Sequence, residues 1–162
     1  MYSEEWNQVI KTYEAYKDSL SVFRNYDNNT TDLSNSLRAI RQLDCYYALE
    51  ALQYMPDKVC IMLLEDLFYV LIYSNVSYSF YAKSIILRVI NNEIVKTIAD
   101  LANKYAQAAT DNEDIKIIAQ LLYEMKNQNS QYIDTYILFT KNFFDSLSKE
   151  VFFEDEESKE LI

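Results

Sequence analysis

The sequence contains no glycine, no histidine and a single proline, Pro56. Glycine supplies the positive-φ positions of tight hairpins and proline punctuates strands, so a sheet protein is not expected from this composition. Asn, Asp and Ser can join helices instead, and we therefore predict an all-α fold. The same absences exclude the glycine-rich loops that cradle phosphate groups, and they remove the commonest general base and metal ligand.

Positive charge is also scarce, because 25 acidic residues outnumber 15 basic ones and give a net charge of −10. Nucleic acids and anionic membrane surfaces attract cationic proteins, so neither is expected as a direct partner. A basic protein partner is favoured instead, since opposite charges steer the encounter of two proteins. The alternative is that the charge serves solubility alone.

Cysteine is represented only by Cys45 and Cys60, which lack the spacing of a metal-binding or redox pair. We predict that both are reduced, buried thiols, and we expect no bound metal and no cofactor. The first residues contain no basic segment followed by an apolar run, so no secretory signal is visible. A cytoplasmic location is expected.

Long apolar runs are absent as well. The most apolar stretch, Leu63–Ile90, is interrupted by charged residues, among them Glu65 and Arg88, and by the polar segment Ser74–Ser77. A membrane span needs about 20 consecutive apolar residues. Because Asn and Ser favour caps and turns, the polar segment divides the stretch. We predict two buried helices here and no membrane span.

Apolar residues recur at helical spacing along the chain and predict seven or eight helices. The first helix begins after Ser3, a favourable N-cap, and ends before the polar segment Asn25–Asp32, which we interpret as a loop. A later segment, Asp57–Tyr73, reads as one continuous helix. The last long helix is expected after Ser130.

The domain organisation follows from length and charge. A chain of 162 residues is most naturally a single domain, which we place at residues 1–150. Residues 151–162 are rich in Asp and Glu and are interpreted as a loose acidic tail.

An internal repeat is visible in the helical region. The segment Ala48–Leu67 can be aligned with Ala82–Leu101, 34 residues later, and a third unit begins at Ala119. The matched positions include Ala48 with Ala82, Asp66 with Asp100, and Leu67 with Leu101. Each unit reads as helix, tight link, helix, so the sequence resembles a short HEAT- or armadillo-type array over about residues 32–148. An irregular helical bundle is the alternative.

Carboxylates are the only abundant catalytic material. All-helical nucleotide pyrophosphohydrolases hold magnesium ions with an EExxE helix and an ExxD helix, and the segment Leu63–Leu71 is similar to the second element. The similarity fails at Leu63, where the motif requires an acid, and the segment SEEWNQ after Tyr2 departs from the first element. Hard metal ions need several converging oxygens, and only two adjacent ones are available. We therefore predict no catalytic residues and no enzyme.

Fifteen tyrosines are the most unusual feature of the composition. Tyrosine rings can border a core with the hydroxyl in water, and tyrosine is also enriched at binding hot spots. On the repeat alignment Asp66 and Asp100 take equivalent positions, and Tyr69, Tyr73 and Tyr105 follow within two turns. We predict that these five residues form a partner-binding face, where acids set orientation and tyrosines supply buried area.

The absence of catalytic residues favours a binding role. In size, charge and helical character the chain resembles the immunity proteins of bacterial toxin systems, which neutralise a cognate toxin by covering an essential surface. We therefore predict a non-catalytic inhibitor of a basic toxin or nuclease. A scaffold or adaptor is the alternative, and a divergent magnesium-dependent nucleotide hydrolase is the third.

Overall fold

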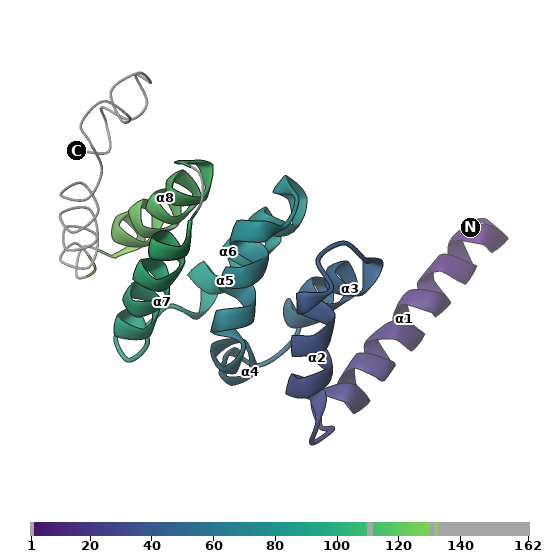
Figure 1. Cartoon of the computed structure of the whole chain (residues 1–162). Coiled ribbons are helices and arrows are strands. Elements are labelled where there is room, and N and C mark those ends of the chain that lie inside the picture. The colour runs from purple at the N-terminus through teal and green to yellow at the C-terminus, as the bar shows by residue number, and fades with distance from the viewer. Residues whose placement is uncertain (1, 110–111, 130–131, 133–162) are drawn as a thin grey trace.

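The computed structural model describes residues 2–109, 112–129 and 132. Within these residues the chain forms eight α-helices and no strand, which confirms the predicted all-α fold (Figure 1). The predicted helix after Ser130 and the acidic tail at residues 151–162 lie outside the described residues. The eight helices are α1 (Glu4–Arg24), α2 (Asn29–Arg38), α3 (Leu43–Leu52), α4 (Asp57–Met62), α5 (Leu64–Tyr73), α6 (Val76–Val89), α7 (Val95–Ala108) and α8 (Asn112–Gln128).

Three helix pairs, α2–α3, α5–α6 and α7–α8, follow one another along the molecule (Figure 1). Helix α5 packs against α2 on one side and α7 on the other, and α6 packs in the same way between α3 and α8. The helices are therefore arranged in two layers, with α2, α5 and α7 in one and α3, α6 and α8 in the other. Short links between the two helices of a pair favour their direct packing.

The internal sequence alignment can be placed on this arrangement. Ala48 and Ala82 lie in α3 and α6, and Leu67 and Leu101 lie in α5 and α7. The aligned segments thus occupy neighbouring helices of the same layer. The short helix α4 lies between α3 and α5, and no counterpart follows α6, where residues 90–94 lead directly into α7. The resemblance to HEAT-type repeats remains a prediction.

Helix boundaries follow the local sequence at two expected positions. The Ser3 side chain accepts a hydrogen bond from the Trp6 backbone N–H at 3.2 Å and caps α1, as predicted. Asn75, inside the predicted break, accepts one from the Tyr78 N–H at 3.1 Å and caps α6. No described residue has a positive φ, so these turns do not require glycine.

The helix predicted over Asp57–Tyr73 is instead divided at Leu63. This residue has φ −103° and ψ 13°, and it separates α4 from α5. Its backbone N–H donates to the Cys60 carbonyl, a three-residue turn in place of the α-helical bond. Because the Leu63 side chain stays buried, the apolar pattern continues through the break and does not reveal it.

The loop predicted over Asn25–Asp32 is shorter than expected, because α2 begins at Asn29. The Asn29 side chain is buried and its amide donates to the Arg24 carbonyl at 2.9 Å. This bond satisfies a free carbonyl at the end of α1 and fixes the turn between the two helices. The contact is tertiary, so the polar composition of the segment does not predict it.

The core is centred on α5. Its buried side chains include Leu67, Phe68 and Leu71, and those of α6 include Ile85 and Ile86. The buried faces of α5 and α6 therefore supply much of the core, as predicted, although Tyr73 and Phe80 of the same stretch are exposed. Among the described residues, no helix combines the length and the apolar character that crossing a membrane requires.

Arg88 of α6 holds the end of α3. Its guanidinium donates to the carbonyls of Leu52 and Gln53, each at 3.0 Å, and contacts the Cys60 sulfur at 3.0 Å. The Leu52 carbonyl ends α3 and the Gln53 carbonyl follows it, so neither has a partner inside the helix.

Both cysteines are free, buried thiols, as predicted, and burial raises the pKa of Cys45 to about 11.

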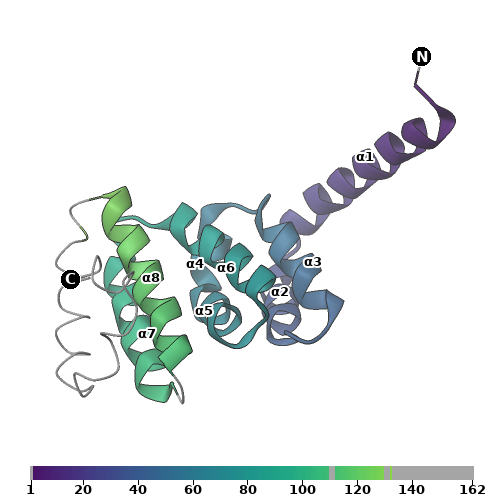
Figure 2. The ribbon, with the colours of Figure 1, turned by 90° about the horizontal axis from the view of Figure 1, so that it is seen from above.

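Helix α1 differs from all the others, because none of its residues is buried. It packs against the core through its C-terminal part, where Leu20 and Phe23 contact the core. Arg24 adds a hydrogen bond to the Tyr54 carbonyl at 2.7 Å. The N-terminal half projects away from the helix pairs (Figure 2).

Candidate protein-binding surfaces

The structure brings the three predicted tyrosines together on the α5–α7 side. The ring centroids of Tyr69 and Tyr73 are 5.1 Å apart, and those of Tyr73 and Tyr105 are 6.1 Å apart. Phe68 stacks on Tyr105 from the core at 5.9 Å. We name Tyr69, Tyr73 and Tyr105 the α5–α7 tyrosine cluster.

The acids beside this cluster are neutralised by the chain itself. Asp66 is buried, with 8% of its surface exposed, and forms an ion pair with Arg38 of α2. Glu65 pairs with Lys104 of α7 at 2.6 Å, which lowers the Glu65 pKa. The Arg38 guanidinium also lies 4.7 Å from the centre of the Tyr69 ring, a cation–π distance. Asp66 is therefore internally paired.

The other predicted residues differ in exposure. Tyr105 is only 6% exposed, its hydroxyl donates to the Glu65 carbonyl at 3.2 Å, and burial raises its pKa to about 12. Tyr73 is 42% exposed. Asp100 is exposed and forms no ion pair with a described residue, although the repeat alignment makes its position equivalent to that of Asp66. The two positions differ because Arg38 of the preceding helix pair covers Asp66 alone.

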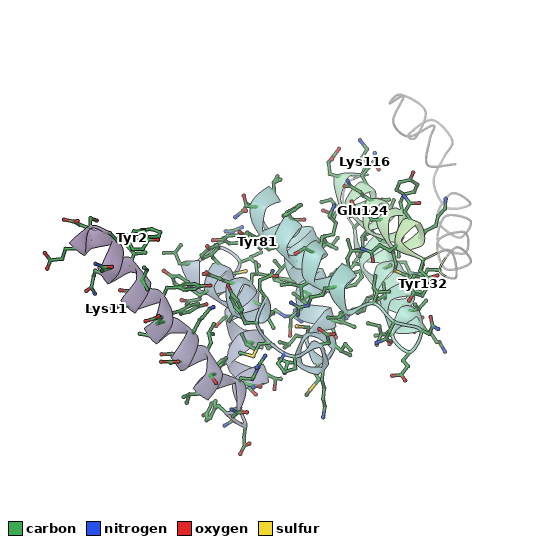
Figure 3. All side chains as sticks on the ribbon, turned by 180° about the vertical axis from the view of Figure 1, so that it is seen from behind. Tyr2, Lys11, Tyr81, Lys116, Glu124 and Tyr132 are labelled. Carbon is green, nitrogen blue, oxygen red and sulfur yellow. The ribbon has the colours of Figure 1, made fainter. Side chains whose placement is uncertain are left out.

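A second aromatic surface lies on the α3–α6 side, and we name it the aromatic patch. Tyr46 is its centre, and its ring lies 5.8 Å from Tyr47, 6.3 Å from Tyr78 and 6.2 Å from Tyr81. Phe80 contacts Tyr81 at 6.4 Å. Tyr47 is 56% exposed and Phe80 63%. Figure 3 marks the position of Tyr81 on α6. Exposed aromatic groups of this extent are typical of interaction sites.

The patch is bordered by carboxylates. A cavity of about 190 Å³ between α2 and α3 is lined by Asp32, Asp44 and Tyr47 together with apolar side chains. Neither aspartate forms an ion pair with a described residue. A basic side chain with a long aliphatic stem matches this combination of apolar wall and negative rim.

The projecting half of α1 presents a further apolar stripe. Trp6, Val9 and Tyr13 are each about half exposed. Figure 3 shows Tyr2 on the side of α1 that faces the helix pairs and Lys11 on the opposite side. The Tyr13 hydroxyl lies 3.4 Å from that of Tyr54, in the turn that follows α3.

The described residues contain no group of three or more His, Cys, Asp or Glu side chains placed to hold a metal ion. The two carboxylates that resemble the hydrolase motif are Glu65 and Asp66, and each is engaged by a cation of a neighbouring helix. A search of protein-family models, of curated proteins and of solved structures finds no match to this chain.

Sequence reasoning did not single out the aromatic patch. Tyr46 and Tyr47 lie in the first half of α3, and Tyr78 and Tyr81 are three residues apart on α6. The crowding of tyrosines in the central third of the sequence was the available signal. It could not show which of them meet, because that depends on the packing of α3 against α6.

Proposed function

We propose that this chain is a non-catalytic protein-binding protein that docks on a basic protein partner through its aromatic patch. The observation that carries the proposal is the exposure of Tyr47 and Phe80 within a continuous group of rings. Removing large aromatic side chains from water supplies most of the free energy at interface hot spots. Burial by a partner would therefore be favourable here.

The charge distribution supports a basic partner. Asp32 and Asp44 lie beside Tyr47, and residues 133–162 carry eight acidic and three basic residues. A net charge of −10 accelerates the approach of a cationic surface and repels nucleic acid. In this proposal the acids act on the association rate and the orientation, and the rings act on the lifetime of the complex.

The specific form that we propose is an inhibitor of the immunity-protein type, which covers an essential surface of a basic toxin or nuclease. A scaffold is the second candidate, favoured by the presence of aromatic groups on both layers, at the patch and at the α5–α7 tyrosine cluster. An inhibitor needs one partner and abolishes its activity. A scaffold holds two partners together and leaves the activity of both intact.

The experiment is affinity capture of the tagged protein from its native cells at low and moderate salt, with three proteins compared. These are the wild type, the patch variant Tyr47→Ser/Phe80→Ser, and the control Tyr73→Ser on the other layer. We expect one dominant basic partner, lost in the patch variant and retained in the control. Binding of the purified partner should weaken about 30-fold or more in the patch variant.

Capture that is equal in all three proteins would contradict the patch as the docking surface. Loss only in Tyr73→Ser would return the site to the α5–α7 tyrosine cluster. Coexpression then separates the two forms of the proposal. An inhibitor restores growth to cells that produce the partner, whereas a scaffold recovers two proteins in one complex and restores nothing.

A further inference from the structure

Glu50 lies on α3, near the end of that helix where α1 comes close to it. On α3 it lies four residues after Tyr46, so these two side chains form one stripe, and Tyr54 follows in the turn beyond the end of α3 at Leu52. The Tyr54 hydroxyl contacts that of Tyr13 and so joins this end of α3 to α1. Tyr16 follows Tyr13 by one turn on the same side of α1. Glu50 is thus a half-buried carboxylate among tyrosines of two helices.

The tyrosines around Glu50 respond to its charge. The Glu50 carboxylate is the main cause of the raised pKa of Tyr46. For Tyr16 burial is the largest cause of the raised pKa, and Glu50 is the next. A carboxylate influences a phenol in this way only across a short distance or a medium of low polarity. The raised pKa values of Tyr16 and Tyr46 therefore agree with the position of Glu50 on the stripe.

Glu50 also lacks the internal cation that accompanies comparable acids. Asp66, Glu65 and Glu124 each form an ion pair with a cation of another helix. Glu50 forms none with any described residue. The neighbouring cation, Lys17 of α1, lies over the Tyr13 ring at 4.8 Å instead. The position combines a negative charge, neighbouring tyrosine side chains and no ion-pair partner among the described residues.

We propose that Glu50, with Tyr16 and Tyr46, is the docking point for a lysine or arginine side chain of the basic partner. This inference rests on the proposed function and names a residue contact within it. The carboxylate supplies the charge, and the tyrosine rings attract the cation through their electron-rich faces. Tyr46 also belongs to the aromatic patch, so the docking point is continuous with the proposed interface.

Other occupants fit this position less well. An apolar side chain would remove Glu50 from water without replacing its hydrogen bonds, which costs free energy. An anionic side chain would add repulsion between like charges. A lysine or arginine satisfies the carboxylate, and its aliphatic stem can lie along the rings. The geometry therefore selects a cation on chemical grounds.

The test uses the full-length chain with isotope-labelled tyrosine and two probes, N-acetyl-arginine amide and uncharged N-acetyl-norleucine amide. We expect the arginine probe to shift the ring resonances of Tyr16 and Tyr46, which Tyr→Phe variants identify. In Glu50→Gln the binding should weaken about fivefold or more. The control Glu93→Gln, an exposed acid in the link before α7, should bind like the wild type.

Three results would overturn the inference. The first is no shift with the arginine probe at its highest concentration, and the second is equal binding in the wild type and Glu50→Gln. The third is a markedly lower melting temperature of Glu50→Gln, because that would give the carboxylate a structural role. We expect an unchanged or slightly higher melting temperature, since an unpaired, half-buried charge is removed.

The inference and the proposed function can fail separately. If Glu50→Gln keeps both probe binding and partner affinity, the docking point is wrong and the patch stands on its own test. If the patch variant keeps full partner affinity while Glu50→Gln loses probe binding, the cation site is real and the patch proposal is wrong. Measuring the partner affinity of Tyr47→Ser/Phe80→Ser and of Glu50→Gln side by side distinguishes these cases.

Discussion

The two tyrosine-rich regions of the molecule contain the same residue type and differ in what covers it. In the α5–α7 tyrosine cluster, Arg38 and Lys104 lie over the rings of Tyr69 and Tyr105 and pair with the adjacent acids. In the aromatic patch no such cover is present among the described residues, and Tyr47 is more than half exposed. The chain's own cations therefore cover part of the first group of tyrosines, whereas the rings of the second group carry no such cover.

The largest contrast is expected between two phenylalanines. Phe68 is fully buried behind the α5–α7 tyrosine cluster, whereas Phe80 is 63% exposed in the aromatic patch. Phe68→Ala should lower the free energy of unfolding by about 3–5 kcal/mol, because it leaves a cavity. Phe80→Ala should change it by less than about 0.5 kcal/mol. Urea denaturation followed by circular dichroism measures both, and similar losses would contradict the comparison.

Alkaline pH should weaken the α5–α7 region through Tyr105. Burial raises the pKa of Tyr105 to about 12. The protonated Tyr105 side chain therefore contributes its full stabilisation of the folded state below the ordinary tyrosine pKa of about 10, and this stabilisation is lost as the pH rises through 12. The free energy of unfolding should fall by about 2–3 kcal/mol over this interval. Tyr105→Phe, which cannot ionise, should lose less over the same interval. An identical pH profile for the two proteins would argue against this assignment.

The buried ion pair gives the next effect. Arg38→Gln leaves the Asp66 carboxylate, 8% exposed, without its cation and should cost about 2 kcal/mol of stability at neutral pH. Thermal unfolding at neutral pH measures this cost. A variant as stable as the wild type at neutral pH would show that solvent, and not Arg38, satisfies Asp66.

The smallest effect is expected at the exposed pair of Glu65 and Lys104, whose side chains are each more than half exposed. Lys104→Gln should cost less than about 0.5 kcal/mol, and high salt should remove the difference. Because Lys104 lowers the Glu65 pKa, the contribution is present at neutral pH and is lost as the pH falls through that lowered pKa. A salt-independent loss would indicate packing by the lysine stem instead.

The fold class could be predicted from sequence because it depends on local chemistry. The absence of glycine, the Ser3 and Asn75 caps and the spacing of apolar residues all reflect chemistry within one or two turns of the chain. The division at Leu63 could not be predicted, since its buried side chain preserves the apolar pattern. The early start of α2 depends on Asn29 contacting the end of α1, which is a tertiary effect.

The candidate site was predictable only in part, for the same physical reason. The spacing of Tyr69 and Tyr73 places their rings together on one helix, and the repeat alignment placed Tyr105 nearby. The burial of Asp66 depends on Arg38, which is 28 residues away in the sequence. The position of Glu50 among tyrosines depends on the approach of α1 to α3. Neither contact leaves a pattern in the sequence.

The attachment of α1 by one end has a consequence for how the molecule can change over time. A helix with no buried residue contributes little to the cooperative unit, so its amide protons should exchange with deuterium well before those of α5. Substitutions on its projecting half should therefore change the stability of the fold very little. This segment can vary in sequence while α5 and its neighbours remain constrained by the core.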